Sequence, residues 1–240
     1  MSTYQAIFRY ISPFFRRRRM RECARLSGST SLPILLKSIA SIHNDITGWC
    51  ELEKAEILAA LCYTTRPARI VEIGVFGGKS LIPMALAMKA AGGDCEVVGI
   101  DPWSKSAATE GYDGANLEWW SSVDLDRVHN SFLTLRDELG LSIRVIRAKS
   151  DHVEWSQPIG VLHIDGQHTE QAVRDVLRYA VHVPPGGYVV VDDIGWVNQG
   201  ATVQVLDAVG ELIALGFVEL YKLGTGAVFQ RTVSPVISGA

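Results

Sequence analysis

Three carboxylates follow two short apolar runs in the second half of the chain. Asp165 ends the run 159–164, and Asp192 and Asp193 end the run 187–191. If these runs are neighbouring parallel strands, the three acids meet at one edge, where they cannot all ionise without a counter-charge. Oxygen ligands favour Mg²⁺ or Ca²⁺ over zinc, and a hydroxyl bound to such an ion loses its proton more readily. The pattern predicts a divalent metal site, although Asp165 could belong to a simple turn and Asp192 could cap a helix.

Two histidines flank the first of these acids. His168 lies three residues after Asp165, and a histidine with a pKa near ~6.5 is a suitable proton acceptor. His168 could therefore act as a general base, orient a metal ligand, or only cap a helix at the surface. His163 lies within the apolar run, so we expect it to be a core residue with its hydrogen bonds satisfied.

Another apolar run, at residues 68–73, leads into a turn that contains glycines. Residues 71–80, which cover the end of the run and the turn, have the sequence VEIGVFGGKS. Glycines let a backbone approach a ligand closely, but the spacing is not the GxGxxG of dinucleotide-binding proteins. Asp101 ends the next run and could accept both hydroxyls of a ribose. This combination is shared by NAD-binding proteins and by methyltransferases that use S-adenosylmethionine, and a tight turn with a capping aspartate is the alternative without a ligand.

The elements that must position these residues alternate along the chain. Apolar runs typical of buried strands alternate with helical patterns, which predicts an α/β fold whose parallel sheet is covered on both faces. The carboxyl ends of parallel strands share one edge, where ligands bind. A hairpin around Gly224 to Gly226 predicts one antiparallel strand at the sheet edge. Strands are expected at 68–73, 96–100, 142–146, 159–164, 187–191, 217–223 and 227–231, and helices at 51–65, 80–91, 124–139, 169–181 and 203–215.

The chain resembles class I S-adenosylmethionine-dependent methyltransferases over about residues 70–231, with EIGVFGGKS as the first motif. The resemblance implies a Rossmann-like three-layer sandwich with a seven-stranded, mostly parallel sheet and one antiparallel strand in the C-terminal hairpin. It implies that S-adenosyl-L-methionine is the cofactor. Glu72 and Gly74 would lie near its methionine part, Asp101 would hold its ribose, and Ser150 would lie near its adenine. The cofactor-binding set is Glu72, Gly74, Phe76, Gly78, Ser80, Asp101 and Ser150.

Within these enzymes the acids resemble those of metal-dependent O-methyltransferases of the macrocin type and, more distantly, of the catechol type. The resemblance implies a divalent cation, Mg²⁺ above all, held by Asp165, Asp192 and Asp193, with His168 and Asp165 as the catalytic residues. A histidine at position 168 and an acid at 193 depart from the catechol pattern. The expected function is therefore metal-assisted O-methylation of a sugar or small-molecule hydroxyl. The alternatives are an NAD-dependent oxidoreductase, a non-catalytic binder of the cofactor, and a protein like cephalosporin hydroxylase.

Composition narrows the classes of protein further. With 240 residues, 48% hydrophobic and 20% charged, the chain can bury a core and is not a disordered protein. A net charge of −3 argues against nucleic acid as the main partner, and no apolar run reaches the ~18 residues of a membrane span. Four cysteines without CxxC spacing indicate thiols in a reducing, cytoplasmic setting.

The basic charge is concentrated at the start of the chain. Residues 1–30 hold seven arginines and one acid, so this segment carries +6 and the remainder −9. Such a segment could contact an anionic membrane surface, dock on the acidic body or a second copy of the chain, or remain in solvent. We expect an extension at 1–40, the methyltransferase domain at 41–231 and a frayed tail at 232–240. The segment 104–123, with Tyr112, Trp119 and Trp120, is expected either to shape the acceptor pocket or to pack on itself.

Overall fold

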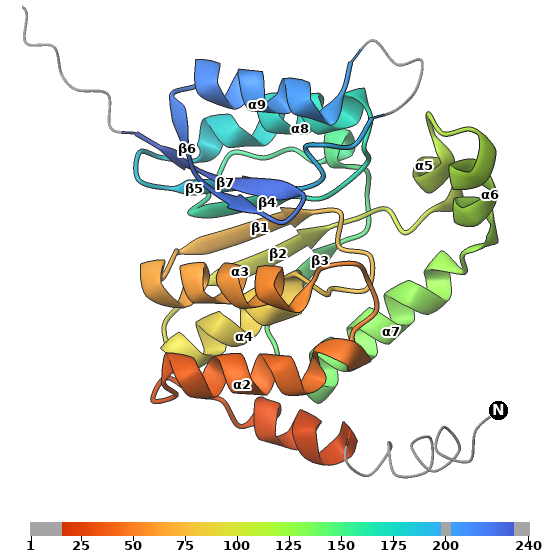
Figure 1. The fold of residues 1–240 in the computed structure, drawn as a ribbon. Helices are drawn as coiled ribbons and strands as arrows, with labels where there is room; N and C mark the ends of the chain where they lie inside the picture. Colours follow the sequence, from red (N-terminus) through yellow and green to blue (C-terminus); the bar gives the residue numbers. More distant parts are fainter. Residues whose placement is uncertain (1–15, 198–202, 233–240) are drawn as a thin grey trace, which may run out of the picture. The chain divides into compact units, whose positions relative to one another are not determined.

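The computed structural model describes residues 16–197 and 203–232 (Figure 1). The chain divides into two compact units. Unit 1 comprises the chain up to Arg66 together with Phe76–Asp94 and Arg127–Ile143. Unit 2 comprises Pro67–Val75, Cys95–Asp126 and the chain from Arg144 onward. Residues 1–15 and 233–240 of the predicted extension and tail lie outside the described residues.

Unit 2 is built on a seven-stranded sheet with the strand order β3-β2-β1-β4-β5-β7-β6. The strands β1, β2, β4 and β5 pair in parallel, so their carboxyl ends lie at one edge of the sheet. Most positions in these strands are buried, as expected for a sheet that is not open to water. The bounds are β1 Arg69–Ile73, β2 Glu96–Ile100, β3 Ile143–Ile146, β4 Val161–Ile164, β5 Tyr188–Val191, β6 Phe217–Leu223 and β7 Gly226–Arg231.

The Rossmann-like α/β fold predicted from the sequence is confirmed, with one correction to the hairpin. Strand β7 pairs antiparallel with both β5 and β6, so β7 is the antiparallel strand. It lies between those two strands, and β6 forms the edge instead. The apolar pattern explains the order, because β7 buries Ala227, Val228 and Phe229 whereas the central residues of β6 are exposed.

Helices α8 (Glu170–Tyr179) and α9 (Val205–Ala214) lie side by side next to the strands of unit 2 (Figure 1). Their apolar faces contribute Val176, Tyr179 and Leu212 to a core shared with Leu162 and Val189 of the sheet. Thr169 caps α8 by accepting a hydrogen bond from the backbone N–H of Gln171, at 3.2 Å. Unit 2 also contains α5 (Lys105–Thr109), α6 (Gly114–Ser122), and the short 3₁₀ turns η2 (Ser150–His152) and η3 (Ala180–His182).

Unit 1 is helical. It contains α2 (Leu32–Ile42), η1 (His43–Asp45), α3 (Leu52–Thr65), α4 (Leu81–Ala91), most of α7 (Leu125–Glu138), and a helical segment at 16–24. Helix α4 is apolar around most of its circumference and packs against α2 and α3. Lys89 at its end donates to the carbonyl oxygens of Ala24 and Leu139, each at 2.8 Å. This lysine therefore ties three segments of unit 1 together.

The domain boundary expected near residue 40 falls inside α2, whose Leu35, Ile39 and Ile42 are fully buried. Residues 32–40 therefore contribute to the core of unit 1. All four cysteines are thiols. Within the described part of the chain, no helix combines the length and the apolar character needed to cross a membrane.

Candidate active site

The acids of the predicted metal site follow β4 and β5, which pair with Ile164 opposite Val191. Asp165 donates its backbone N–H to Ile73 of β1, and Asp192 donates its own to Ile164 of β4, both at 2.9 Å. The sheet ladder thus continues one residue beyond each strand. It holds the Cα atoms of Asp165 and Asp192 side by side, as the strand-end argument predicted.

Two groups of possible ligands share Asp165. In the inner group, one ligand atom from each of His163, Asp165 and Asp192 lies within 4.8 Å of the others. In the outer group, the same holds for Asp165, His168 and Asp193. The three predicted acids are therefore divided between two groups, each completed by a histidine. Asp193, which belongs to the outer group, has a left-handed backbone with φ of 49°.

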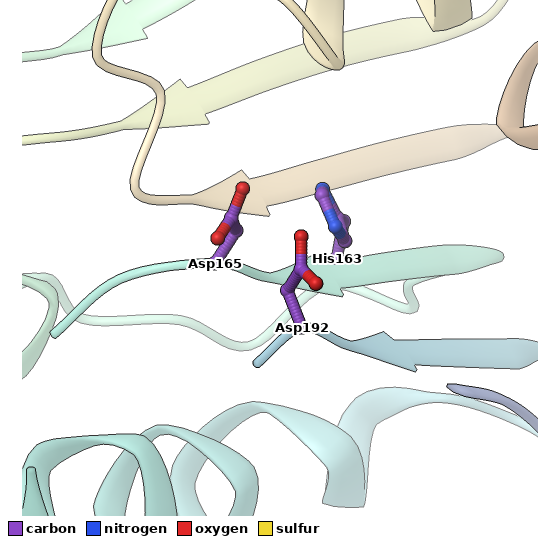
Figure 2. Close-up of side chains that lie close together, drawn as sticks. All are labelled: His163, Asp165 and Asp192. Carbon is purple, nitrogen blue, oxygen red and sulfur yellow. The ribbon is translucent and has the colours of Figure 1, made fainter. Parts of the chain in front are cut away.

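His163 of the inner group forms a fully buried pair with Glu72. They are direct partners in the register of β1 and β4, and the Nδ1 atom of His163 lies 2.7 Å from Oε1 of Glu72. Burial alone would lower the pKa of His163, but the hydrogen bond to Glu72 and the charges of Asp165 and Asp192 outweigh it and raise that pKa. The surroundings of this ring therefore favour positive charge. Figure 2 shows His163, Asp165 and Asp192 extending from β4 and β5 to the same side.

The sequence predicts a core residue with satisfied hydrogen bonds at His163, but the structure satisfies only one of its ring nitrogens. Nε2 is buried and makes no hydrogen bond. The alternation of side chains along a strand was the signal that could have placed His163 in the site, because residues 163 and 165 must point to the same face.

His168 belongs to the outer group, where its Nε2 atom lies 2.9 Å from Oδ2 of Asp193. The ring of Trp196 packs against the imidazole, with centroids 4.8 Å apart. A carboxylate that accepts a hydrogen bond from Nε2 leaves Nδ1 of the neutral ring as a proton acceptor. The geometry is thus compatible with the general base that the sequence suggested, and equally with a residue that orients Asp193.

Thr225 orients the Asp192 carboxylate, a role that the sequence argument missed. Its hydroxyl donates to Oδ1 of Asp192 at 3.0 Å, and its carbonyl accepts the backbone N–H of Ile194 at 2.9 Å. A Cβ atom on Gly226 would overlap with the carbonyl oxygen of Val191, so glycine lets the turn approach the end of β5. The sequence marked these residues only as a hairpin turn, since their contact with Asp192 depends on β7 lying beside β5.

The segment 104–123 contains α5 and α6 and is tied to the loop that carries His168. The backbone N–H of His168 donates to the hydroxyl of Tyr112 at 3.3 Å. The Gln167 amide donates to the carbonyl oxygens of Ala107 and Glu110. Burial raises the pKa of Tyr112, so its phenol stays protonated. This segment therefore borders the candidate site within unit 2.

Four of the predicted cofactor residues belong to unit 2. Asp101 accepts backbone hydrogen bonds from Val75 at 3.0 Å and Trp103 at 2.7 Å, one on each carboxylate oxygen. Gly74 has φ of 86°, and a Cβ atom there would overlap with the carbonyl oxygen of Asp165. Ser150 is buried at 7% exposure, and the Glu72 carboxylate faces His163. The glycine turn is therefore bound to the end of β2 and packed on the end of β4.

The other three predicted cofactor residues, Phe76, Gly78 and Ser80, belong to unit 1. Phe76 has φ of 48° and stacks on Trp49, with ring centroids 5.0 Å apart. Gly78 has φ of 82°, and a Cβ atom there would press on the ring of Phe132. Ser80 is buried at the N-terminus of α4. The second half of the turn thus has a positive φ at both Phe76 and Gly78, a conformation that glycine adopts readily.

These features agree with the comparison with known families. A family model described as a methyltransferase domain matches residues 71–194, which is just over half of the chain. The matched region includes the glycine turn and all five residues of the inner and outer groups. The chain belongs to this methyltransferase family. No curated protein matches it significantly in sequence.

Solved structures support the same fold for this methyltransferase. The O-methyltransferase NovP is 19% identical with a TM-score of 0.62, over 84% of this chain and 98% of that one. The O-methyltransferase from Bacillus cereus in complex with SAH is 12% identical with a TM-score of 0.55, over 83% and 90% of the two chains. The O-methyltransferase TomG from Streptomyces achromogenes, involved in tomaymycin synthesis and solved with SAM, is 18% identical with a TM-score of 0.53, over 83% and 90%.

Proposed function

We propose that this methyltransferase transfers a methyl group from S-adenosyl-L-methionine to the hydroxyl oxygen of a sugar or another small molecule, assisted by a divalent cation. The observation that carries the proposal is the gathering of Asp165, Asp192 and Asp193 with two histidines at the ends of β4 and β5. Structural relatives solved with SAM or SAH support the choice of cofactor.

The donor set fits a divalent cation, because carboxylates that lie close together at neighbouring strand ends are stabilised by a shared positive charge. Asp165, Asp192 and Asp193 would hold the ion, with Mg²⁺ favoured by the oxygen ligands, and Thr225 would keep the Asp192 carboxylate in position. Such an ion, when bound, lowers the pKa of a coordinated hydroxyl. Asp101 would hold the ribose of the cofactor and Ser150 would lie near its adenine.

His168 would remove the proton of the acceptor hydroxyl. The Asp193 carboxylate, 2.9 Å from Nε2, would stabilise the imidazolium that forms, and Trp196 would limit the movement of the ring. The acceptor oxygen forms a bond to the methyl carbon as the bond from that carbon to the sulfonium sulfur breaks. The products are the methyl ether, S-adenosylhomocysteine and one proton on His168.

The exposed aromatic residues of unit 2 suit a sugar or a flat ring system. Trp196 is 37% exposed next to His168, and Trp119 is 43% exposed in α6, where it meets Trp120 edge to face. Aromatic faces pack well on the CH surfaces of sugars. Since Tyr112 links the α5–α6 segment to the His168 backbone, this segment would contribute to acceptor binding.

Calorimetric titration of S-adenosylhomocysteine, followed by Mg²⁺ with and without chelator, tests the proposal. We expect the wild type to bind both, and Asp192→Ala to keep the binding of S-adenosylhomocysteine while losing the cation heat and methyl transfer. A conservative control is Thr225→Ser, which retains the hydroxyl that orients Asp192 and should retain cation binding. Thermal stabilisation of the protein by NAD and not by S-adenosylhomocysteine would favour the oxidoreductase alternative. Loss of both S-adenosylhomocysteine binding and cation binding in Asp192→Ala would refute a separate metal role.

A further inference from the structure

The inner group contains a buried ring nitrogen that the proposed mechanism does not use. His163 is fully inaccessible to solvent, and its Nε2 atom makes no hydrogen bond. Burying a polar group without a partner costs free energy, because the group loses its hydrogen bonds to water. An orphaned ring nitrogen beside two carboxylates therefore indicates a missing ligand.

The other nitrogen of the same ring is already held by a carboxylate. Nδ1 of His163 lies 2.7 Å from Oε1 of Glu72, and both residues are fully buried. Histidines that bind metals commonly donate their second ring N–H to a carboxylate, which fixes the tautomer and makes the ligating nitrogen more basic. With Nδ1–H donated to Glu72, Nε2 is the nitrogen that can bind a cation in place of a proton.

The neighbours of this ring are the two acids best placed to share a cation with it. One ligand atom each from His163, Asp165 and Asp192 lies within 4.8 Å of the other two, and all three side chains extend to the same side in Figure 2. His163 and Asp165 are two residues apart on one strand, and Asp192 follows the adjacent strand. The sheet itself therefore fixes the relative positions of the three Cα atoms.

We propose that His163 is a nitrogen ligand of the cation, together with Asp165 and Asp192, and that the site prefers Mn²⁺ or another first-row transition metal to Mg²⁺. The proposal rests on the cation site of the proposed function and revises its ligands, with His163 in the place of Asp193. An imidazole nitrogen favours transition metals, whereas Mg²⁺ prefers oxygen alone. Asp193 is then left to pair with His168 in the outer group.

The experiment uses the full-length protein and Mn²⁺ alone. Pulsed electron paramagnetic resonance detects a nitrogen coordinated to Mn²⁺ by its modulation of the spin echo. We expect a ¹⁴N modulation in the wild type that changes to that of ¹⁵N when only histidine is labelled with ¹⁵N. This measurement needs no substitution at His163, whose removal would leave Glu72 buried without this partner and could prevent folding.

The variant His168→Gln separates the two histidines. His168 is partly exposed, so this variant should fold, and we expect it to keep the histidine nitrogen signal. We also expect the wild type to bind Mn²⁺ at least about 10-fold more tightly than Mg²⁺ in a competition titration. The variant His163→Gln, where its circular dichroism matches that of the wild type, should lose the nitrogen signal and bind Mn²⁺ about 10- to 100-fold more weakly.

The other outcomes separate this inference from the function on which it rests. Tight Mn²⁺ binding without any nitrogen signal would overturn the role of His163 and leave an all-oxygen cation site in place. Loss of the signal in His168→Gln would overturn it as well, because the ion would then belong to the outer group. No binding of either Mn²⁺ or Mg²⁺ would remove the inference and the metal-assisted function together.

Discussion

Several ionisable side chains of unit 2 are almost completely buried, and each is buried with a specific neighbour. Glu72 and His163 are paired across β1 and β4, and Asp192 accepts the Thr225 hydroxyl. Asp175 of α8 is 1% exposed and accepts a hydrogen bond from Gln171 at 3.0 Å. Glu72, His163 and Asp192 could be singled out from the sequence, because they lie within or directly after apolar runs. Asp175 lies on a helix like any other surface acid, and its burial depends on packing that no local pattern records.

Asp175 should make the protein less stable as the pH rises. Burial raises its pKa from 3.8 to about 6, so the folded state binds the proton more tightly than the unfolded state. The resulting stability is fully present below the unfolded pKa of ~3.9 and is lost as the pH rises through about 6. We expect Asp175→Asn to raise the free energy of unfolding by up to about 3 kcal/mol at pH 8, with a gain that shrinks steadily toward pH 5.

Urea denaturation of both proteins at pH 5, 6.5 and 8 measures this difference directly. Asparagine keeps an oxygen that can accept the hydrogen bond from Gln171, so the comparison changes mainly the charge. If Asp175→Asn were no more stable than the wild type at pH 8, the prediction would be wrong. The hydrogen bonds from Gln171 and its neighbours would then stabilise the ionised carboxylate enough to offset the cost of its burial.

At the scale of elements, local pattern predicted what each segment forms but not where it lies. The helix expected at 51–65 is α3 at Leu52–Thr65, and the strand expected at 96–100 is β2. Apolar runs and glycine stops are local signals, so such elements are found within one or two residues. The inward position of β7 was missed because strand order depends on contacts between distant segments. The helices α5 and α6 were also missed, since both are short and α6 buries no residue.

Two glycines test how closely the elements of the site are packed. Gly74 has φ of 86° and packs on the Asp165 carbonyl, whereas Gly210 lies in α9 with open space around it. We expect Gly74→Ala to lower the free energy of unfolding by about 2–5 kcal/mol, because it adds both backbone strain and an overlap. Gly210→Ala should raise it by about 0.5–1 kcal/mol, because alanine favours a helix.

Chemical denaturation monitored by circular dichroism provides both values, and Gly210→Ala serves as the matched control for adding one methyl group. Mn²⁺ binding by Gly74→Ala gives a second readout, since a displaced Asp165 would weaken the site. A Gly74→Ala protein with wild-type stability would show that the turn and the end of β4 can separate easily, contrary to the packing described above.

At the scale of the whole molecule, the chain joins a basic N-terminal segment of +6 to a remainder of −9. Within unit 1, Arg16 pairs with Glu138 at 3.3 Å and Arg19 with Asp45 at 2.9 Å, so part of this segment docks on its own unit. Arg17, Arg21 and Arg25 are exposed and recur every four residues, in and just after the helical segment 16–24. Residues at this spacing lie on one side of a helix and turn the basic charge outward.

We propose that this outward stripe of Arg17, Arg21 and Arg25 contacts an anionic membrane surface. Each arginine near such a surface contributes about 1 kcal/mol, and the apolar residues Ile7, Phe8 and Ile11 precede the stripe in the sequence. The full-length protein should therefore sediment with vesicles that contain phosphatidylserine and not with purely zwitterionic vesicles. Replacing the three arginines by alanine should reduce the bound fraction at least about 10-fold, and added salt should weaken binding by the wild type.

A control variant of equal charge separates the stripe from net charge alone. Arg144, Arg174 and Lys222 are surface residues of unit 2 that pair with Glu96, Glu170 and Glu219. Replacing these three by alanine removes the same formal charge and should leave vesicle binding nearly unchanged. If both triple variants lost binding equally, the effect would come from overall charge. A different result would point to a second copy of the chain as the partner of the stripe. In that case neither the wild type nor the control variant would sediment with vesicles. Light scattering would show that the wild type is a dimer and that the stripe variant is not.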